Sequence, residues 1–154
     1  MVLETKNDNN LVQKFVDLST ELYNYTCSKN MIGNKNYDSK MSIKKGKIID
    51  KIVKKIINSP EQMDEFINLL DNENLLTSYL ASEYLYPIYP EKCLNIMNLF
   101  YNKLEDKIDK YTVKTKIEGL SLQEKFFLDT YKKLYNTDNL ESLNREDKEK
   151  VIQP

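Results

Sequence analysis

Apolar residues recur along most of the chain at spacings of three and four, which places them on one face of an α-helix. The clearest stripe lies within residues 74–100 and consists of Thr77, Leu80, Ala81, Tyr84, Leu85 and Ile88. The small side chain of Ala81 would let a second helix approach closely, while Pro87 and Pro90 end one helix and begin the next. This stretch therefore predicts a helix, a short proline-bounded turn and a second helix.

Two long helices are predicted within the first 58 residues. The first begins at the capping residue Asn10 and ends between residues 30 and 33. The side chains on its inner face are Leu11, Phe15, Leu18, Leu22 and Tyr25. The second covers about residues 34–58, and its apolar stripe consists of Ile48, Ile49, Ile52, Val53, Ile56 and Ile57. Gly46 lies inside this second helix, where glycine costs up to ~1 kcal/mol relative to alanine, so a bend or a break is expected there.

Capping signals place the remaining helices. Ser59 and Pro60 start a third helix, with an inner stripe of Met63, Phe66, Ile67 and Leu70. The helix after Pro90 directs inward Cys93, Ile96, Met97, Phe100 and Leu104. A further helix over about residues 105–118 ends at Gly119, and its inner side is expected to carry Ile108, Tyr111, Thr112 and Thr115. Residues 121–124 match a capping box, which predicts a last helix over about residues 122–135.

Composition agrees with a helical protein. The 154 residues include only three glycines and four prolines, with 40% apolar and 31% charged residues, so the turn-rich signature of an all-β protein is missing. The prediction is an all-α fold of antiparallel helix pairs joined by short turns, as an α-solenoid or a small helical bundle. We expect one helical domain over residues 1–136, followed by a charged tail or short helix over residues 137–154.

Charge is balanced overall, at −1, but it is segregated along the chain. Residues 35–58 hold eight lysines against two acids, a local excess of +6. Residues 59–91 hold no lysine or arginine, and their seven acids are Glu61, Asp64, Glu65, Asp71, Glu73, Glu83 and Glu91. A basic helix is thus followed by an acidic segment.

Candidate chemistry is sparse. The chain contains no histidine, and Cys27 and Cys93 are too far apart for a CxxC or zinc-knuckle pattern, so neither a metal site nor a cofactor is expected. Acid pairs such as Glu61 and Glu65 are more typical of a solvated helix face than of a catalytic site, and we expect no enzyme. The first residues lack an apolar leader and no run is long enough to span a bilayer, so a cytoplasmic protein without a membrane partner is predicted.

The proline-bounded stretch resembles a family of short bacterial proteins with HEAT-like helical repeats, described only as a domain of unknown function. The residues that carry the resemblance are Thr77, Ser78, Leu80, Ala81, Ser82, Leu85, Tyr86 and Pro87, followed by Pro90, Glu91, Lys92, Cys93 and Leu94. Residues 33–40 also resemble a helix start in that family, and the match covers roughly residues 20–120. The resemblance implies HEAT-like helix pairs and an interaction protein, of a helical type frequent among immunity proteins that neutralise bacterial toxins.

Two roles follow for the surface. In the first, acids and exposed tyrosines bind a basic protein partner, with a cognate toxin as the candidate, through Glu61, Asp64, Glu65, Asp71, Glu73, Tyr79, Glu83 and Tyr86. Tyrosines contribute to this surface only where they are exposed, and the alternative is that another helix covers them. In the second, an acidic partner or a nucleic-acid backbone binds the basic helix through Lys44, Lys47, Lys51 and Lys55. Arg145 is the single arginine, so nucleic acid is the less favoured partner, and the oligomeric state is left open.

Overall fold

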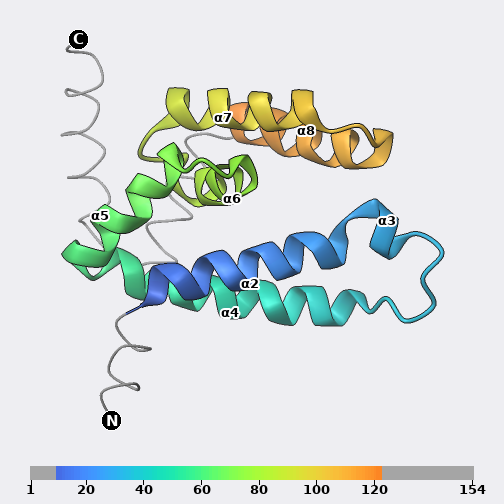
Figure 1. The fold of residues 1–154 in the computed structure, drawn as a ribbon, viewed down its shortest axis with the longest axis horizontal. Coiled ribbons are helices and arrows are strands. Elements are labelled where there is room, and N and C mark those ends of the chain that lie inside the picture. The colour runs from blue at the N-terminus through green and yellow to red at the C-terminus, as the bar shows by residue number, and fades with distance from the viewer. Residues whose placement is uncertain (1–9, 123–154) are drawn as a thin grey trace. The chain divides into compact units, whose positions relative to one another are not determined.

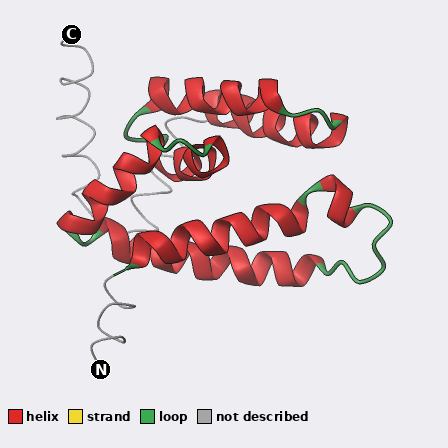
Figure 2. Cartoon of the chain, in the orientation of Figure 1, coloured by secondary structure: helices red, strands yellow, loops and turns green. Residues whose placement is uncertain are grey.

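The computed structural model describes the backbone of residues 10–122 and the side chains of residues 10–120. These residues form helices and turns with no strand among them (Figure 1, Figure 2), which confirms the all-α prediction. The chain forms two compact units, Met1–Leu69 and Leu70–Pro154. The single domain over residues 1–136 stays a prediction. Most of the helix expected over residues 122–135 and the tail over 137–154 lie outside the described residues.

The first unit is built on a pair of long helices, α2 (Leu11–Thr26) and α4 (Ser39–Ile57), which run antiparallel side by side (Figure 1). Both begin at a side-chain cap: the Gln13 N–H donates to Asn10 Oδ1 over 3.3 Å, and the Lys40 N–H donates to Asp38 Oδ1 over 2.9 Å. The start at Asn10 confirms the prediction. α4 passes through Gly46 without a break, because one glycine costs too little to interrupt a helix whose other residues pack.

The core of the first unit joins both long helices to α5 (Pro60–Asn68). The Phe15 and Phe66 rings meet edge to face with centroids 4.9 Å apart, and both side chains are fully buried. Leu11 N–H donates to Gln62 Oε1 over 2.9 Å, which ties the start of α2 to α5. The α5 helix begins at Pro60, as the sequence predicted.

The connection between α2 and α4 departs from the prediction. α2 ends at Thr26, earlier than expected, and after the extended residue Cys27 a single turn, α3 (Ser28–Met31), follows. Gly33 then has a φ of 77°, in the left-handed region that favours glycine. The Tyr25 and Tyr37 rings stack at 5.0 Å, and the N–H of Asp38 donates to Tyr25 Oη over 2.8 Å. The end of α2 and the beginning of α4 are thereby fastened together.

The second unit contains α6 (Leu75–Leu85), α7 (Pro90–Lys103) and α8 (Lys107–Leu122), preceded by the 3-10 turn η1 (Leu69–Asp71). Asn74 caps α6 by accepting the N–H of Leu76 over 3.0 Å, and Pro90 occupies the first turn of α7, so the proline-bounded helix pair is confirmed. α7 and α8 run antiparallel side by side (Figure 1). The α7 side chains Cys93, Ile96, Met97 and Phe100 are buried as predicted.

The α6 helix is buried around most of its circumference rather than along one stripe. Every residue from Thr77 to Ser82 is buried, together with Leu85. Two of the buried hydroxyls bond to backbone carbonyls: Ser82 Oγ donates to the Tyr79 carbonyl over 2.6 Å, and Ser78 Oγ to that of Asn72 over 3.1 Å. A serine whose hydroxyl is satisfied within its own segment can be buried at little cost, so the polar side of α6 is covered as well.

The α8 helix corrects two predictions. It continues through Gly119 to Leu122, so Gly119 is not a helix stop and Ser121 lies within α8 rather than capping the next helix. Val113 and Leu120 are buried, and the residues expected inward are all exposed: Ile108, Tyr111, Thr112 and Thr115. The packed face follows Val113, Ile117 and Leu120, which are spaced at i, i+4 and i+7. The prediction instead placed Tyr111 and two threonines on the inner face.

Candidate partner-binding surfaces

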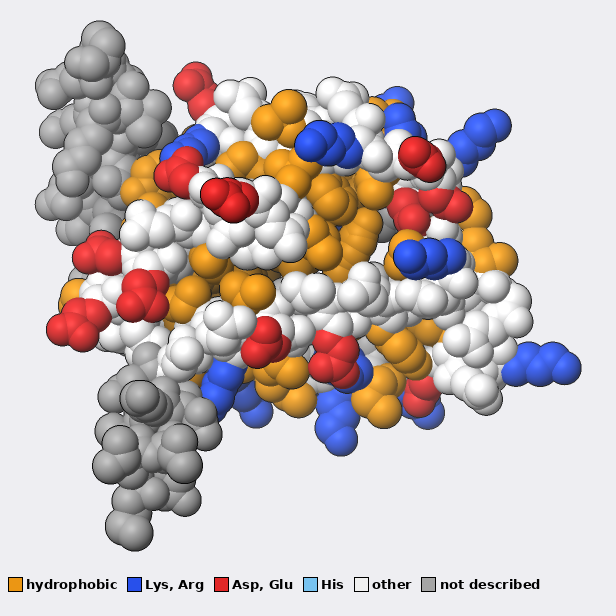
Figure 3. Space-filling model, viewed as in Figure 1, with side chains coloured by type: hydrophobic (Ala, Val, Ile, Leu, Met, Phe, Trp, Pro, Cys, Tyr) orange, Lys and Arg blue, Asp and Glu red, His pale blue; other side chains and the backbone are white. Residues whose placement is uncertain are grey.

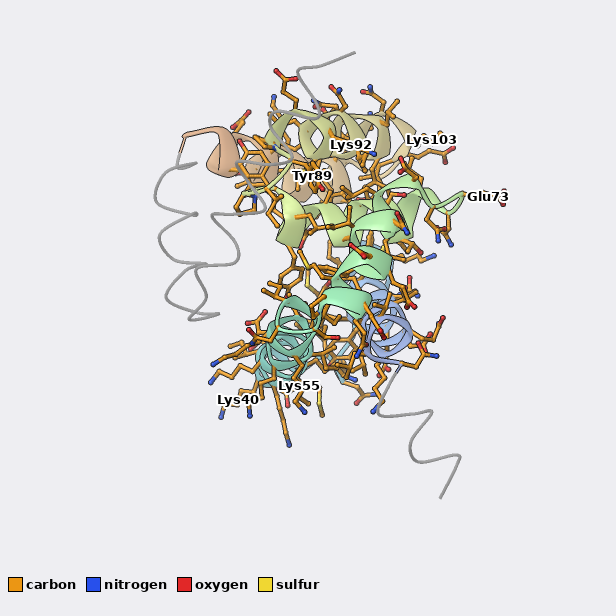
Figure 4. The ribbon with its side chains drawn as sticks, turned by 90° about the vertical axis from the view of Figure 1, so that its left-hand side faces the viewer. Lys40, Lys55, Glu73, Tyr89, Lys92 and Lys103 are labelled. Carbon is orange, nitrogen blue, oxygen red and sulfur yellow. The ribbon has the colours of Figure 1, made fainter. Side chains whose placement is uncertain are left out.

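The outer side of α4 carries a row of lysines that we call the Lys face. Its members follow one another at spacings of 4, 3, 4 and 4 residues and are all exposed: Lys40, Lys44, Lys47, Lys51 and Lys55. Lys40 and Lys55 extend away from the helix toward solvent (Figure 4). None of the five forms an ion pair with a residue of the described range 10–120, so their charge is available to a partner.

Large apolar side chains border the Lys face. Met41 and Ile48 are each 44% exposed, and Ile43 is 60% exposed. Along the edge where Figure 1 places α4, hydrophobic side chains lie beside lysines (Figure 3). Ile48 was predicted in the core, but Ile49, Val53 and Ile56 occupy the packed side of α4 and leave Ile48 outside. Ile48 was assigned to the core because it belongs to a stripe of six apolar residues spread over positions 48–57, which is wider than the face that α4 buries.

A second surface is the acidic row of α5, which consists of Glu61, Asp64 and Glu65. All three are exposed on adjacent turns, opposite the buried Met63 and Phe66. None of the three pairs with a lysine among the side chains described. The acidic row is therefore a small negative face with no neutralising ion pair among the described residues, and its contact with a partner stays a prediction.

The other predicted acids belong to the second unit, where part of their charge is neutralised. Asp71 pairs with Lys92 at 2.9 Å, and Glu83 of α6 pairs with Lys116 of α8 at 3.0 Å. Glu73 is exposed at the turn before α6 (Figure 4). The acidic set that is continuous in sequence is thus divided between two units, and only some of its members offer an unpaired charge.

The aromatic part of the predicted partner surface is wrong. Tyr79 is 3% exposed and Tyr86 is 2% exposed, so neither can contact a partner, whereas Tyr84, expected in the core, is half-buried. The Tyr79 ring stacks on Phe100 of α7 with centroids 4.3 Å apart and planes inclined by 15°. The large apolar area of the ring is therefore used in packing.

The two thiols offer little chemistry. Burial raises the pKa of the Cys93 thiol from 9.0 to about 12, against a smaller lowering effect of Lys92, so the thiol is protonated at neutral pH. Cys27 is half-buried, and neither cysteine forms a disulfide bond. Among the described residues, no group of three or more His, Cys, Asp or Glu side chains is placed to hold a metal ion. No helix within the same residues has both the length and the apolar character that crossing a bilayer requires.

Comparisons of the chain with family models, with curated proteins and with solved structures give no match.

Proposed function

We propose that the chain is a non-catalytic protein-binding module whose acidic row contacts a basic partner. The observation that supports this most is the exposure of Glu61, Asp64 and Glu65 on adjacent turns of α5 without an ion pair among the described residues. Carboxylates that are not neutralised internally attract a positively charged partner over several ångströms and raise the rate of encounter. Because α5 is anchored through Phe66 and Gln62, the row is held on a fixed support.

A bacterial nuclease toxin is the partner class that we propose. Its nucleic-acid cleft must be basic in order to hold phosphates, so an acidic row inserted there would exclude the substrate. The sequence resemblance to a HEAT-like family implies an interaction protein of a helical type frequent among immunity proteins, which is compatible with the same role. Tyr79 and Tyr86 take no part in this proposal because both are buried.

The test reverses the charge of the acidic row. The partner is first captured with the purified chain, and binding is then measured by calorimetry with a triple variant, Glu61→Lys, Asp64→Lys and Glu65→Lys. A matched control reverses three exposed acids elsewhere, namely Asp17, Glu105 and Glu118. Both variants change the net charge equally, so a loss of at least about tenfold in affinity or association rate with the first variant alone identifies a local contact. Equal binding by both variants would remove the acidic row from the interface.

A second candidate function is binding of an acidic partner through the Lys face. The observation in its favour is the combination of five unpaired lysines with exposed apolar neighbours on one helix. Its variant changes Lys44, Lys47, Lys51 and Lys55 to Glu, and its matched control changes the exposed Lys29, Lys103, Lys107 and Lys114. If the acidic-row variant and the Lys-face variant both bind a captured partner normally, both candidate functions fail.

A further inference from the structure

We propose that the Lys face of α4 and its apolar border bind the surface of an anionic phospholipid bilayer, with α4 lying along the bilayer plane. The inference rests on the second candidate function and names its acidic partner. The sequence argument against a membrane partner concerned segments that span a bilayer, whereas this contact is peripheral and needs no span.

The geometry of the Lys face matches a flat, negatively charged surface. Five lysines follow a single line along one helix, and Lys40 and Lys55 are separated by 15 positions, or about 22 Å of helix. A straight row of charges can approach a plane at every member simultaneously. Lysine ammonium groups on flexible stems interact with phosphate as point charges, which suits headgroups that have no fixed pattern.

The apolar border distinguishes a bilayer from other polyanions. Ile48 lies between Lys44 and Lys51, at i−4 and i+3, while Ile43 borders the row on its other side. These side chains are exposed in the protein, and an interfacial helix buries such residues about 5–10 Å deep, at the boundary between headgroups and acyl chains. A nucleic-acid backbone offers an isoleucine no comparable apolar environment.

The residue types of α4 also disfavour nucleic acid. The helix contains neither arginine nor an aromatic residue, so it offers no bidentate contact to phosphate or guanine and no ring for base stacking. An acidic protein surface with its own apolar patch would satisfy the charge as well. Titration with poly-glutamate, described below, distinguishes an acidic protein partner from a bilayer.

The first experiment measures sedimentation of the full chain with vesicles. One vesicle type contains about one-third phosphatidylglycerol in phosphatidylcholine, and the other contains phosphatidylcholine alone. We expect binding to the anionic vesicles only, weakening as salt is added. Each Lys→Gln change should reduce binding about fivefold, so changing Lys44, Lys47, Lys51 and Lys55 together reduces it by a factor on the order of several hundred. The matched control, with Lys→Gln at Lys29, Lys103, Lys107 and Lys114, should lose far less of the binding to anionic vesicles.

The second experiment tests insertion of the apolar border. The chain contains no tryptophan, so Ile48→Trp introduces a single fluorescent reporter, and Tyr111→Trp on the exposed side of α8 is its control. Anionic vesicles should shift the emission of the first variant to shorter wavelength and leave the second unchanged. Ile43→Ser in the native chain should weaken vesicle binding, most clearly at high salt, where the electrostatic contribution is screened.

Parallel titrations with poly-glutamate and with a DNA duplex separate this inference from the candidate function on which it rests. Failure to bind anionic vesicles, or binding without an emission shift at position 48, overturns the bilayer inference. If the chain still binds poly-glutamate and the Lys-face variant does not, the second candidate function survives. If poly-glutamate also fails to bind, both are overturned. Duplex DNA bound more tightly than the anionic vesicles would also overturn the bilayer inference.

Discussion

Replacing Tyr79 with alanine tests the burial of a residue that the sequence had placed on the partner surface. The ring is 3% exposed and stacks on Phe100 at 4.3 Å, so the change removes a packed ring and leaves a cavity between α6 and α7. Truncation of a buried aromatic residue costs about 3–5 kcal/mol, of which the ring pair itself accounts for about 0.5–1.5 kcal/mol. Such a loss is a large part of the stability of a chain of this size.

The assay is urea unfolding followed by circular dichroism, with Tyr111→Ala as the matched control because Tyr111 is 71% exposed. We expect Tyr79→Ala to lower the free energy of unfolding by at least about 3 kcal/mol and Tyr111→Ala to change it by less than about 0.5 kcal/mol. A double-mutant cycle with Phe100→Ala should yield a coupling of about 0.5–1.5 kcal/mol. Equal, small effects for both tyrosines would refute the packing of α6 against α7 and return Tyr79 to the surface.

Three further predictions concern backbone and polar groups. Gly119→Ala should stabilise the chain by about 0.5–1 kcal/mol in the same unfolding assay, because an added Cβ meets nothing within 4 Å in a continuous helix; a helix stop there would yield the opposite sign. Cys93 should alkylate far more slowly than Cys27 in a mass-spectrometric time course. Because burial raises the pKa of the Cys93 thiol from 9.0 to about 12, the contribution of this thiol to stability is present below pH 9 and is lost as pH rises toward 12. Cys93→Ala should lessen that loss of stability at high pH. Equal labelling of both thiols would contradict the burial of Cys93. Ser19→Ala should raise the unfolding free energy by about 1 kcal/mol, because the buried Ser19 Oγ has no hydrogen-bond partner among the described residues; destabilisation would show that the hydroxyl is bonded.

The candidate surfaces differ in how far the sequence determined them. The exposure of the Lys face and of the acidic row could be predicted, because long charged side chains are almost never fully buried and helical periodicity places them opposite the apolar stripe. Their role in binding a partner stays a prediction. The apolar border of the Lys face was not predicted. Whether Ile48 packs or faces solvent depends on the width of the surface that α2 and α5 present to α4, and sequence periodicity contains no information about that width.

The starts of α2, α5, α6 and α7 were determined largely by the sequence, whereas the ends of α2 and α8 were not. The side chains of Asn10 and Asn74 each accept a hydrogen bond from an N–H in the first helical turn, and the fixed φ of Pro60 and Pro90 favours a helix start. Both effects act within one helical turn, so no distant residue is needed. What only the tertiary structure decided is which sides of α6 and α8 are covered. Tyr79 is buried because Phe100 of another helix stacks on it, and Tyr111 is exposed because α8 packs through Val113 and Leu120. Burial depends on neighbours that are distant in sequence, whereas capping depends on residues only a few positions away.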